Sequence, residues 1–127
     1  MSEESRKNML QLVISNIWHV SNKEYQKRVW IGGKGPEGDD FDETSMYILD
    51  EGESLLQERK YLDITDHQYN LLKTFWNEYE AFCDKPGLEH YLLELFIDTQ
   101  EWTKITELAK EVIKAFDYHY VFPSIKM

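Results

Sequence analysis

The fold is decided by residues 65–84, which read TDHQYNLLKTFWNEYEAFCD. Thr65 followed three residues later by Gln68 forms a capping box, a pairing that typically starts a helix. After it, apolar side chains recur every three or four residues, as they do on one face of a helix with 3.6 residues per turn. The spacing predicts an amphipathic helix from about Asp66 to Asp84, ended by Lys85-Pro86-Gly87. Its apolar face comprises Tyr69, Leu72, Phe75, Trp76, Tyr79, Phe82 and Cys83.

A long helix is also predicted near each end of the chain. The first starts at Ser2, which precedes two acids, and runs to about Val20. Its apolar positions, three or four residues apart, are Leu10, Val13, Ile14 and Ile17. The last helix is capped by Asp98 or Thr99 and ends near Phe116. Its expected core face comprises Trp102, Ile105, Leu108, Val112 and Phe116.

The centre of the chain predicts a fourth long helix, from about Phe41 to Lys60. The tetrapeptide Asp40-Phe-Asp-Glu43 is typical of a helix start, and acids there suit the positive end of the helix dipole. Gly52 lies inside this helix and weakens it by about 1 kcal/mol relative to Ala. Before it, residues Gly32 to Asp40 hold four Gly and Pro36, which indicates a loop.

Two shorter elements complete the prediction. Ser21-Asn-Lys-Glu24 reads as a capping box with Ser21 at the cap, which opens a short helix through Val29 that stops at Gly32-Gly33. Arg28 to Ile31 is alternatively an extended segment. Leu88 to Phe96 is a short apolar stretch that predicts one or two helical turns.

These elements together predict the fold class. The 127 residues are 42% hydrophobic, which is enough for one core. Long amphipathic helices joined by short loops must bury their apolar faces on one another. We therefore expect an all-α, single-domain helical bundle over residues 1–127, with four main amphipathic helices and one or two short accessory helices.

The formal net charge of −10 is concentrated in one segment, because residues 37–58 contain nine acids and no Lys or Arg. Nucleic acids and anionic membranes bind positively charged surfaces, so neither is the expected partner. The single cysteine, Cys83, excludes an intrachain disulfide. No apolar run approaches the roughly 18 residues that span a bilayer, and we expect a cytoplasmic location.

No motif in the chain predicts catalysis, a cofactor or a metal site. Gly33 to Gly38 matches the Gly-x-Gly-x-x-Gly pattern of dinucleotide sites. No β-α-β context surrounds it and Pro36 removes a backbone donor, which favours a simple turn. The acids of residues 39–43 offer oxygen ligands, but their spacing fits no EF-hand loop, which favours a solvated helix start. The four histidines lack metal-ligand spacing, and Cys83 lies on an apolar face, as an inert buried thiol does.

The helix from Phe41 to Lys60 carries the candidate binding surface. On a helical wheel its apolar residues lie within about 60° of one direction, and its acids lie on the opposite side together with Met46 and Tyr47. Carboxylates can engage a basic protein, and Met and Tyr are enriched in protein interfaces. The alternatives are a merely solvated face and a face covered by another helix. The predicted partner-binding residues are Asp39, Asp40, Asp42, Glu43, Met46, Tyr47, Asp50, Glu51, Glu53 and Glu58.

Two segments of this small acidic chain resemble the immunity proteins of bacterial contact-dependent and polymorphic toxin systems. They are Gly33-Lys-Gly-Pro-Glu-Gly-Asp-Asp-Phe-Asp-Glu-Thr44 and Phe96-Ile-Asp-Thr-Gln-Glu-Trp102. The resemblance implies a cytoplasmic inhibitor, not an enzyme, that binds one cognate toxin domain. It assigns no role to individual residues.

Two other functions remain open at this point. A homodimer would bury the aromatic residues left over by the helical faces, namely Trp18, Trp30, Tyr118 and Tyr120. A divalent-metal enzyme would use the clustered carboxylates to hold a cation that activates water. The expectation that the charge pattern favours is a module that binds a basic protein.

Overall fold

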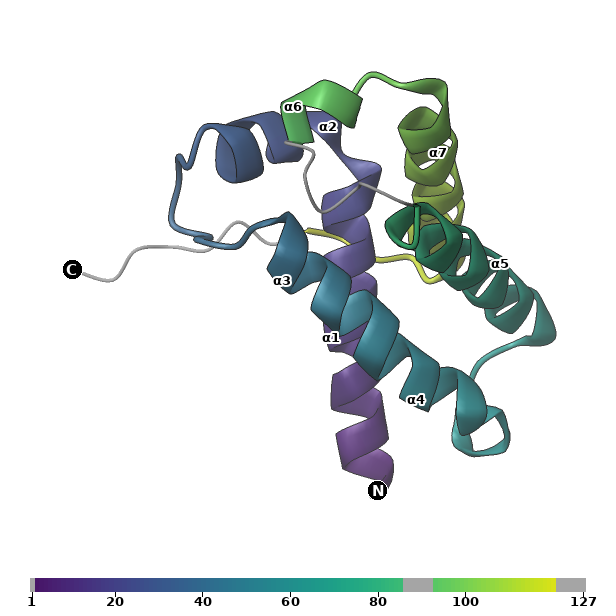
Figure 1. Ribbon diagram of the computed structural model, residues 1–127. Helices are drawn as coiled ribbons and strands as arrows, with labels where there is room; N and C mark the ends of the chain where they lie inside the picture. Colours follow the sequence, from purple (N-terminus) through teal and green to yellow (C-terminus); the bar gives the residue numbers. More distant parts are fainter. Residues whose placement is uncertain (1, 86–92, 121–127) are drawn as a thin grey trace.

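The computed structural model describes residues 2–85 and 93–120, and every regular element in those ranges is a helix (Figure 1). The predicted all-α class is therefore confirmed. Three long helices are α1 (Glu3–Ser21), α5 (Asp66–Cys83) and α7 (Gln100–Ala115). A fourth is built from three consecutive segments, α3 (Phe41–Met46), η2 (Tyr47–Glu51) and α4 (Gly52–Gln57). The shorter elements are α2 (Lys23–Tyr25), η1 (Gln26–Ile31), η3 (Arg59–Tyr61) and α6 (Leu93–Phe96).

The four long helices begin where the sequence predicts. The Gln68 N–H donates to Thr65 Oγ1 at 3.0 Å and the Thr65 N–H donates to Gln68 Oε1 at 2.9 Å, which completes the capping box of α5. Ser2 caps α1, Asp40 caps α3, and Thr99 rather than Asp98 caps α7. Each cap satisfies a backbone N–H that the first turn would otherwise leave unpaired.

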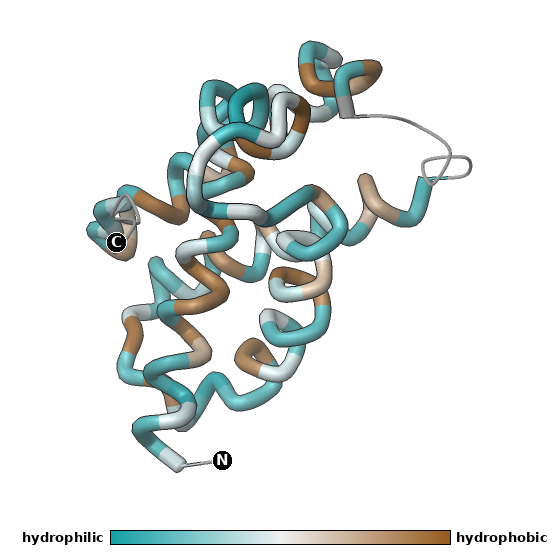
Figure 2. The backbone as a smooth tube through the Cα atoms, turned by 90° about the vertical axis from the view of Figure 1, so that its left-hand side faces the viewer, coloured by the Kyte–Doolittle hydropathy of each residue, from teal (hydrophilic) through white to brown (hydrophobic). Residues whose placement is uncertain are grey.

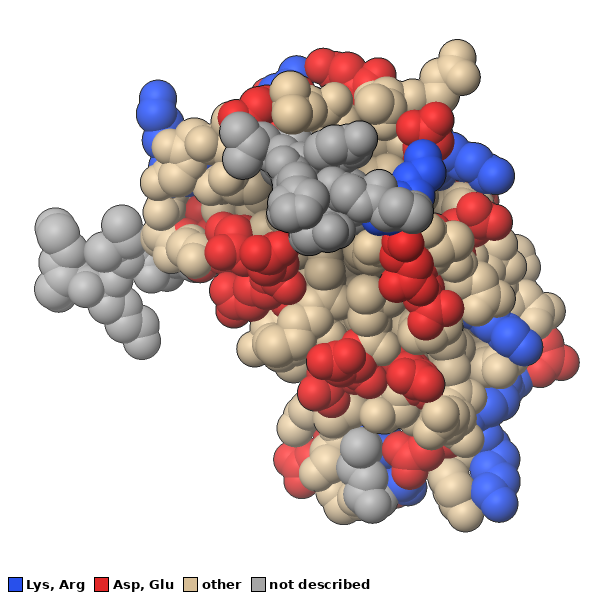
Figure 3. All heavy atoms as spheres, viewed as in Figure 1, with Lys and Arg blue, Asp and Glu red and all other residues tan. Residues whose placement is uncertain are grey.

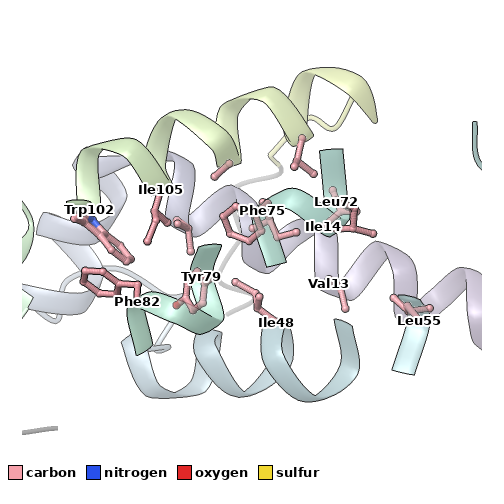
Figure 4. Packing of buried hydrophobic residues seen from close by; sticks show 14 of the residues in the cluster. Val13, Ile14, Ile48, Leu55, Leu72, Phe75, Tyr79, Phe82, Trp102 and Ile105 are labelled. Carbon is pink, nitrogen blue, oxygen red and sulfur yellow. The ribbon is translucent and has the colours of Figure 1, made fainter. Parts of the chain in front are cut away.

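The apolar faces of the four long helices meet in one core. In Figure 1, α1 stands in the middle, the α3–η2–α4 helix crosses it, and α5 lies beside α7. Brown and teal alternate along each helix in Figure 2, as expected of amphipathic helices. Figure 4 shows side chains from all four helices packed together. The largest fully buried apolar side chains include Trp102, Tyr79, Phe75, Ile14, Ile17, Ile48, Leu55 and Leu72.

The central helix departs from the prediction in its bounds and in its period. It ends at Gln57, not at Lys60, and residues 59–61 form a separate 3₁₀ turn. Residues Tyr47–Glu51 are π-helical, with more residues per turn than an α-helix. The Trp76 indole N–H donates to the carbonyls of Ile48 at 3.0 Å and Leu49 at 3.3 Å, so a side chain of α5 holds this segment.

The segment between α1 and the glycine-rich loop also differs from the prediction. Asn22, not Ser21, caps the short helix, because the Asn22 side chain accepts the Tyr25 N–H at 2.9 Å. Ser21 still belongs to α1, and its hydroxyl donates to the Trp18 carbonyl at 2.6 Å. Residues Gln26–Ile31 are π-helical, so the extended alternative is wrong.

Gln26 is a buried polar residue that ties three elements together. Its side chain is 0% exposed. The amide Nε2 donates to the carbonyls of His19 and Val20, both at 2.9 Å, near the C-terminal end of α1. Its Oε1 accepts the Trp102 indole N–H at 2.9 Å, which joins α7 to the same point. The bonds to Gln26 thus fix how α1, η1 and α7 meet.

Several predicted positions lie where the structure describes only part of the stretch. Leu93–Phe96 is helical, and residues 88–92 fall outside the described ranges, as do Pro86 and Gly87. On α7, Leu108 and Phe116 are partly buried against the core, while Thr106 and Ala109 are fully buried.

In the ranges that the structure covers, no helix has both the length and the apolar character needed to cross a bilayer.

Candidate functional site

The acid-rich segment runs along one face of the molecule, which we call the acidic face. It is formed by the α3–η2–α4 helix, and Figure 3 shows carboxylates over α3 and α4 with Lys and Arg atoms mostly toward the margins of the view. Five of the predicted carboxylates on it are exposed: Asp40, Asp42, Glu43, Asp50 and Glu53. Glu51 is half-exposed.

The exposed carboxylates of this face lack counter-ions within the described parts of the chain. Across residues 2–85 and 93–120, no Lys or Arg forms an ion pair with Asp42, Glu43 or Asp50. The same holds for Glu51 and Glu53. The acidic face therefore presents net negative charge to solvent.

Met46 and Tyr47 lie among these carboxylates, as predicted. Met46 is 49% exposed, an unusual position for a large apolar side chain. Asp42 and Asp50 are four residues before and after it, so they flank it on the same stripe of the helix. Tyr47 is half-buried and faces a cleft beside the helix. An apolar side chain ringed by carboxylates is the arrangement of an interface anchor with a polar rim.

Two of the predicted residues act inside the molecule instead. Asp39 is largely buried, with 12% of its side chain exposed: its Oδ2 lies 2.8 Å from His19 Nδ1, and its Oδ1 accepts the Tyr25 hydroxyl at 2.5 Å. Glu58, which follows the π-helical segment, forms an ion pair with Arg6 of α1, with 3.8 Å between Glu58 Oε1 and Arg6 Nη1. A helical wheel cannot detect these partners, because they come from α1 and α2.

The environment of Asp39 fixes its charge and the protonation of its neighbours. Burial raises the pKa of Asp39, but hydrogen bonds from His19 and Tyr25 outweigh burial and hold that pKa below its ordinary value. Burial, and then the bond to Asp39, raises the pKa of Tyr25. Because an ionised carboxylate can only accept, the His19 Nδ1 carries the proton of this contact.

Glu37 anchors the glycine-rich loop through a second cluster. The Arg28 guanidinium donates to both Glu37 oxygens, at 2.9 and 2.6 Å, and the Tyr120 hydroxyl also donates to this carboxylate. The hydrogen bonds from Arg28 lower the pKa of Glu37 to about 2 even though burial opposes them. Arg28 also lies over the Tyr25 ring, 5.6 Å from its centroid, within cation–π range.

The Gly-x-Gly-x-x-Gly pattern has a conformational explanation. Gly33, Gly35 and Gly38 all have positive φ angles, of 62°, 109° and 68°, which residues with a Cβ rarely adopt. A Cβ on Gly35 would also collide with the Arg28 guanidinium. The glycines thus allow the loop to turn back and bring Glu37 and Asp39 to their partners.

The aromatic residues that suggested a homodimer have contacts within the chain. The Trp18 and Tyr120 rings stack with centroids 3.9 Å apart and planes 2° apart, and His19 stacks on Tyr25 at 4.4 Å. Trp30 and Tyr118 pack against the core. These rings therefore do not require a second copy of the chain to cover them.

A cleft of about 270 Å³ opens between α1, the glycine-rich loop and the start of η2. Its walls carry the carboxylates of Glu37, Asp39 and Glu43 and the rings of Tyr25, Tyr47 and Tyr120. Only Asp39, Glu43 and Tyr47 of this set were predicted as site residues. The sequence could not single out the others, because residues from 12 to 120 meet at this cleft only after folding.

Cys83 and a metal site are the two other candidates for a chemical role that the sequence raised. Burial raises the pKa of the Cys83 thiol to about 12, so this sulfur is protonated and unreactive as a nucleophile at neutral pH. Within the residues described, no three His, Cys, Asp or Glu side chains gather in an arrangement that could hold a metal ion.

Comparisons with protein-family models, with curated proteins and with solved structures found no match to this chain. The resemblance to immunity proteins therefore stays a prediction.

Proposed function

We propose that this protein is a binding module whose acidic face engages a basic protein. The observation that carries the proposal is the surroundings of Met46: its side chain is half-exposed, the exposed carboxylates Asp42 and Asp50 flank it, and no described Lys or Arg pairs with them. A partner that covers Met46 and supplies cations would satisfy both features at once.

The two kinds of group would act at different stages of binding. The carboxylates attract a positively charged surface over about 10 Å at 0.1 M salt and so speed encounter. Met46 and Tyr47 make short-range contacts that exclude water and slow dissociation. A salt-sensitive association rate combined with a slow dissociation rate is therefore the expected kinetic signature.

An inhibitor would use the same chemistry. Proteins that bind nucleic acids carry basic clefts for phosphate groups, and a helix lined with carboxylates can occupy such a cleft. The immunity-type role suggested by the sequence is a specific form of this proposal, in which the basic partner is a toxin domain. The carboxylates that would face such a cleft are Asp42, Glu43, Asp50 and Glu53.

The proposal is tested with two double variants of equal charge. The face variant carries Asp42→Lys and Asp50→Lys, and the control variant carries Glu80→Lys and Glu111→Lys, two exposed acids of α5 and α7. Wild type and control should capture the same basic protein from the native cell extract at about 0.1 M salt and release it at about 1 M, where the Debye length falls to about 3 Å. The face variant should capture none. Equal capture by both variants would show that the acidic face is not the binding surface.

A further inference from the structure

The cleft beside the acidic face is small and open, and one side chain of a partner could enter it. Its volume of about 270 Å³ lies below the range of roughly 300–1,000 Å³ that is usual for small-molecule pockets. Glu43 and Tyr47 belong both to the cleft wall and to the acidic face, so the cleft opens onto the surface that we propose as the interface.

The charge of the cleft is negative after its internal partners are counted. Glu37 is balanced by the bidentate bond from Arg28. Asp39 is ionised, because hydrogen bonds from His19 and Tyr25 hold its pKa below the ordinary value despite burial. Glu43 is exposed and has no ion pair with a described Lys or Arg. A ligand that is cationic therefore has an electrostatic advantage over a neutral one.

The hydrogen-bonding groups of the cleft require a ligand that donates. The hydroxyls of Tyr25 and Tyr120 already donate to Asp39 and Glu37. Asn16 is only 5% exposed, and its amide Nδ2 donates to the Leu12 carbonyl at 2.9 Å. Asn16 lines the cleft, and within the described residues its Oδ1 accepts no hydrogen bond. This oxygen is therefore available to accept a hydrogen bond from a ligand in the cleft.

Two residues of the cleft wall, Glu37 and Tyr25, already bind a guanidinium, that of Arg28, which does not itself line the cleft. Arg28 reaches Glu37 with two parallel N–H groups and covers the Tyr25 ring, which are the two interactions that distinguish arginine from lysine. Glu43 and the Tyr47 ring, which also line the cleft, offer the same combination of carboxylate and aromatic face. A planar group with five N–H donors fits these acceptors better than a compact ammonium does.

We propose that this cleft receives the guanidinium of one arginine side chain of the basic partner, with Glu43 and the Asn16 Oδ1 as acceptors and Tyr47 as the stacking surface. This inference rests on the proposed function. It adds that the basic partner inserts an arginine side chain into the cleft. The arginine would form a second anchor beside Met46. Because the cleft is partly buried against α1, a contact there is stronger than one on the open face.

The test uses a capped tripeptide, acetyl-Gly-Arg-Gly-amide, added to the full-length protein and followed by ¹H–¹⁵N NMR. The Asn16 side-chain amide and the backbone amides of Glu43 and Tyr47 should shift and saturate together at millimolar peptide, an affinity of about −4 kcal/mol. Two matched peptides provide the comparison. The citrulline peptide, which lacks the charge, should cause no saturable shift, and the lysine peptide should bind several-fold more weakly.

A pair of single variants locates the binding. Glu43→Gln should weaken the arginine peptide about fivefold, the effect of losing about 1 kcal/mol of ion pairing. Asp50→Asn removes the same charge from the open face and should change the affinity less than about twofold. Equal binding of arginine and citrulline peptides, or equal effects of the two variants, would overturn the arginine cleft.

The outcome of this test can be separated from that of the proposed function. The face variant changes Asp42 and Asp50, neither of which lines the cleft. If the peptide shifts fail while the face variant still loses the basic protein, then only the arginine cleft is wrong. If the face variant keeps its partner, the proposed function fails whatever the peptides do.

Discussion

Gln26 shows how one buried side chain can decide the meeting of three helices. It supplies two donors and one acceptor, and each has a partner at 2.9 Å. Nothing in the sequence distinguishes it from an exposed glutamine, because its partners His19, Val20 and Trp102 are brought to it by the fold. The role of Gln26 could not be predicted from the sequence for this reason.

Replacing Gln26 with Leu should destabilise the protein by about 2–4 kcal/mol, because the Trp102 indole N–H and two carbonyls would lose their partner inside the molecule. The free energy of unfolding in urea measures the effect. Gln57→Leu, at the exposed end of α4, is the matched control and should change stability by less than about 0.5 kcal/mol. A similar loss in both variants would contradict the role given to Gln26.

Glu37 should make stability depend on acid pH. Its pKa is about 2 in the folded protein and 4.5 as the ordinary value, so the folded state favours the ionised form. A lowered pKa contributes stability that is fully present above about pH 4.5 and is lost as the pH falls toward 2. The Glu37→Gln variant lacks this titration. The difference in unfolding free energy between wild type and variant should therefore shrink over this window, and a constant difference would contradict the Arg28–Glu37 cluster.

At the scale of the elements, the central helix shows the limits of periodicity. Its N-terminal cap and its first turns are as predicted, because both depend on residues 40–44 alone. The π-helical segment is not predicted, since it is held by Trp76, which lies 28 residues beyond Ile48 in the chain. Thr44, in the turns before this segment, is buried, and its hydroxyl donates to Asp39 Oδ2 at 3.4 Å and lies 3.2 Å from His19 Nδ1.

Gly52 gives a direct test of that helix contact. By helix propensity alone, Gly52→Ala should stabilise the folded protein by about 1 kcal/mol. A Cβ at this position would lie 3.0 Å from Trp76 Cδ1, and the indole is held by its bond to Ile48, so we expect a net loss of about 1 kcal/mol instead. Thermal or urea unfolding measures the sign. Ser54→Ala, exposed two residues later, should be neutral or stabilising, and a stabilised Gly52→Ala would show that Trp76 moves freely.

At the scale of the whole molecule, local signals were sufficient for the fold class. Four caps and four apolar faces, each readable within about 20 residues, predict the all-α arrangement that the structure shows. The exposed part of the acidic face was predictable in the same way, because Asp42, Met46 and Asp50 share one stripe. The cleft was not, since Asn16, Glu37 and Tyr120 become neighbours only through tertiary packing.

The affinity of the acidic face for its captured basic partner tests the central claim most directly. At about 0.1 M salt, the Asp42→Lys/Asp50→Lys variant should bind at least about tenfold more weakly than wild type, mainly through a slower association rate. It should also unfold at the same or a higher temperature, because it reduces the repulsion among the carboxylates of this face. The Glu80→Lys/Glu111→Lys control should stay within about threefold of wild type. Equal affinities for wild type and the face variant, with both folded, would contradict the account.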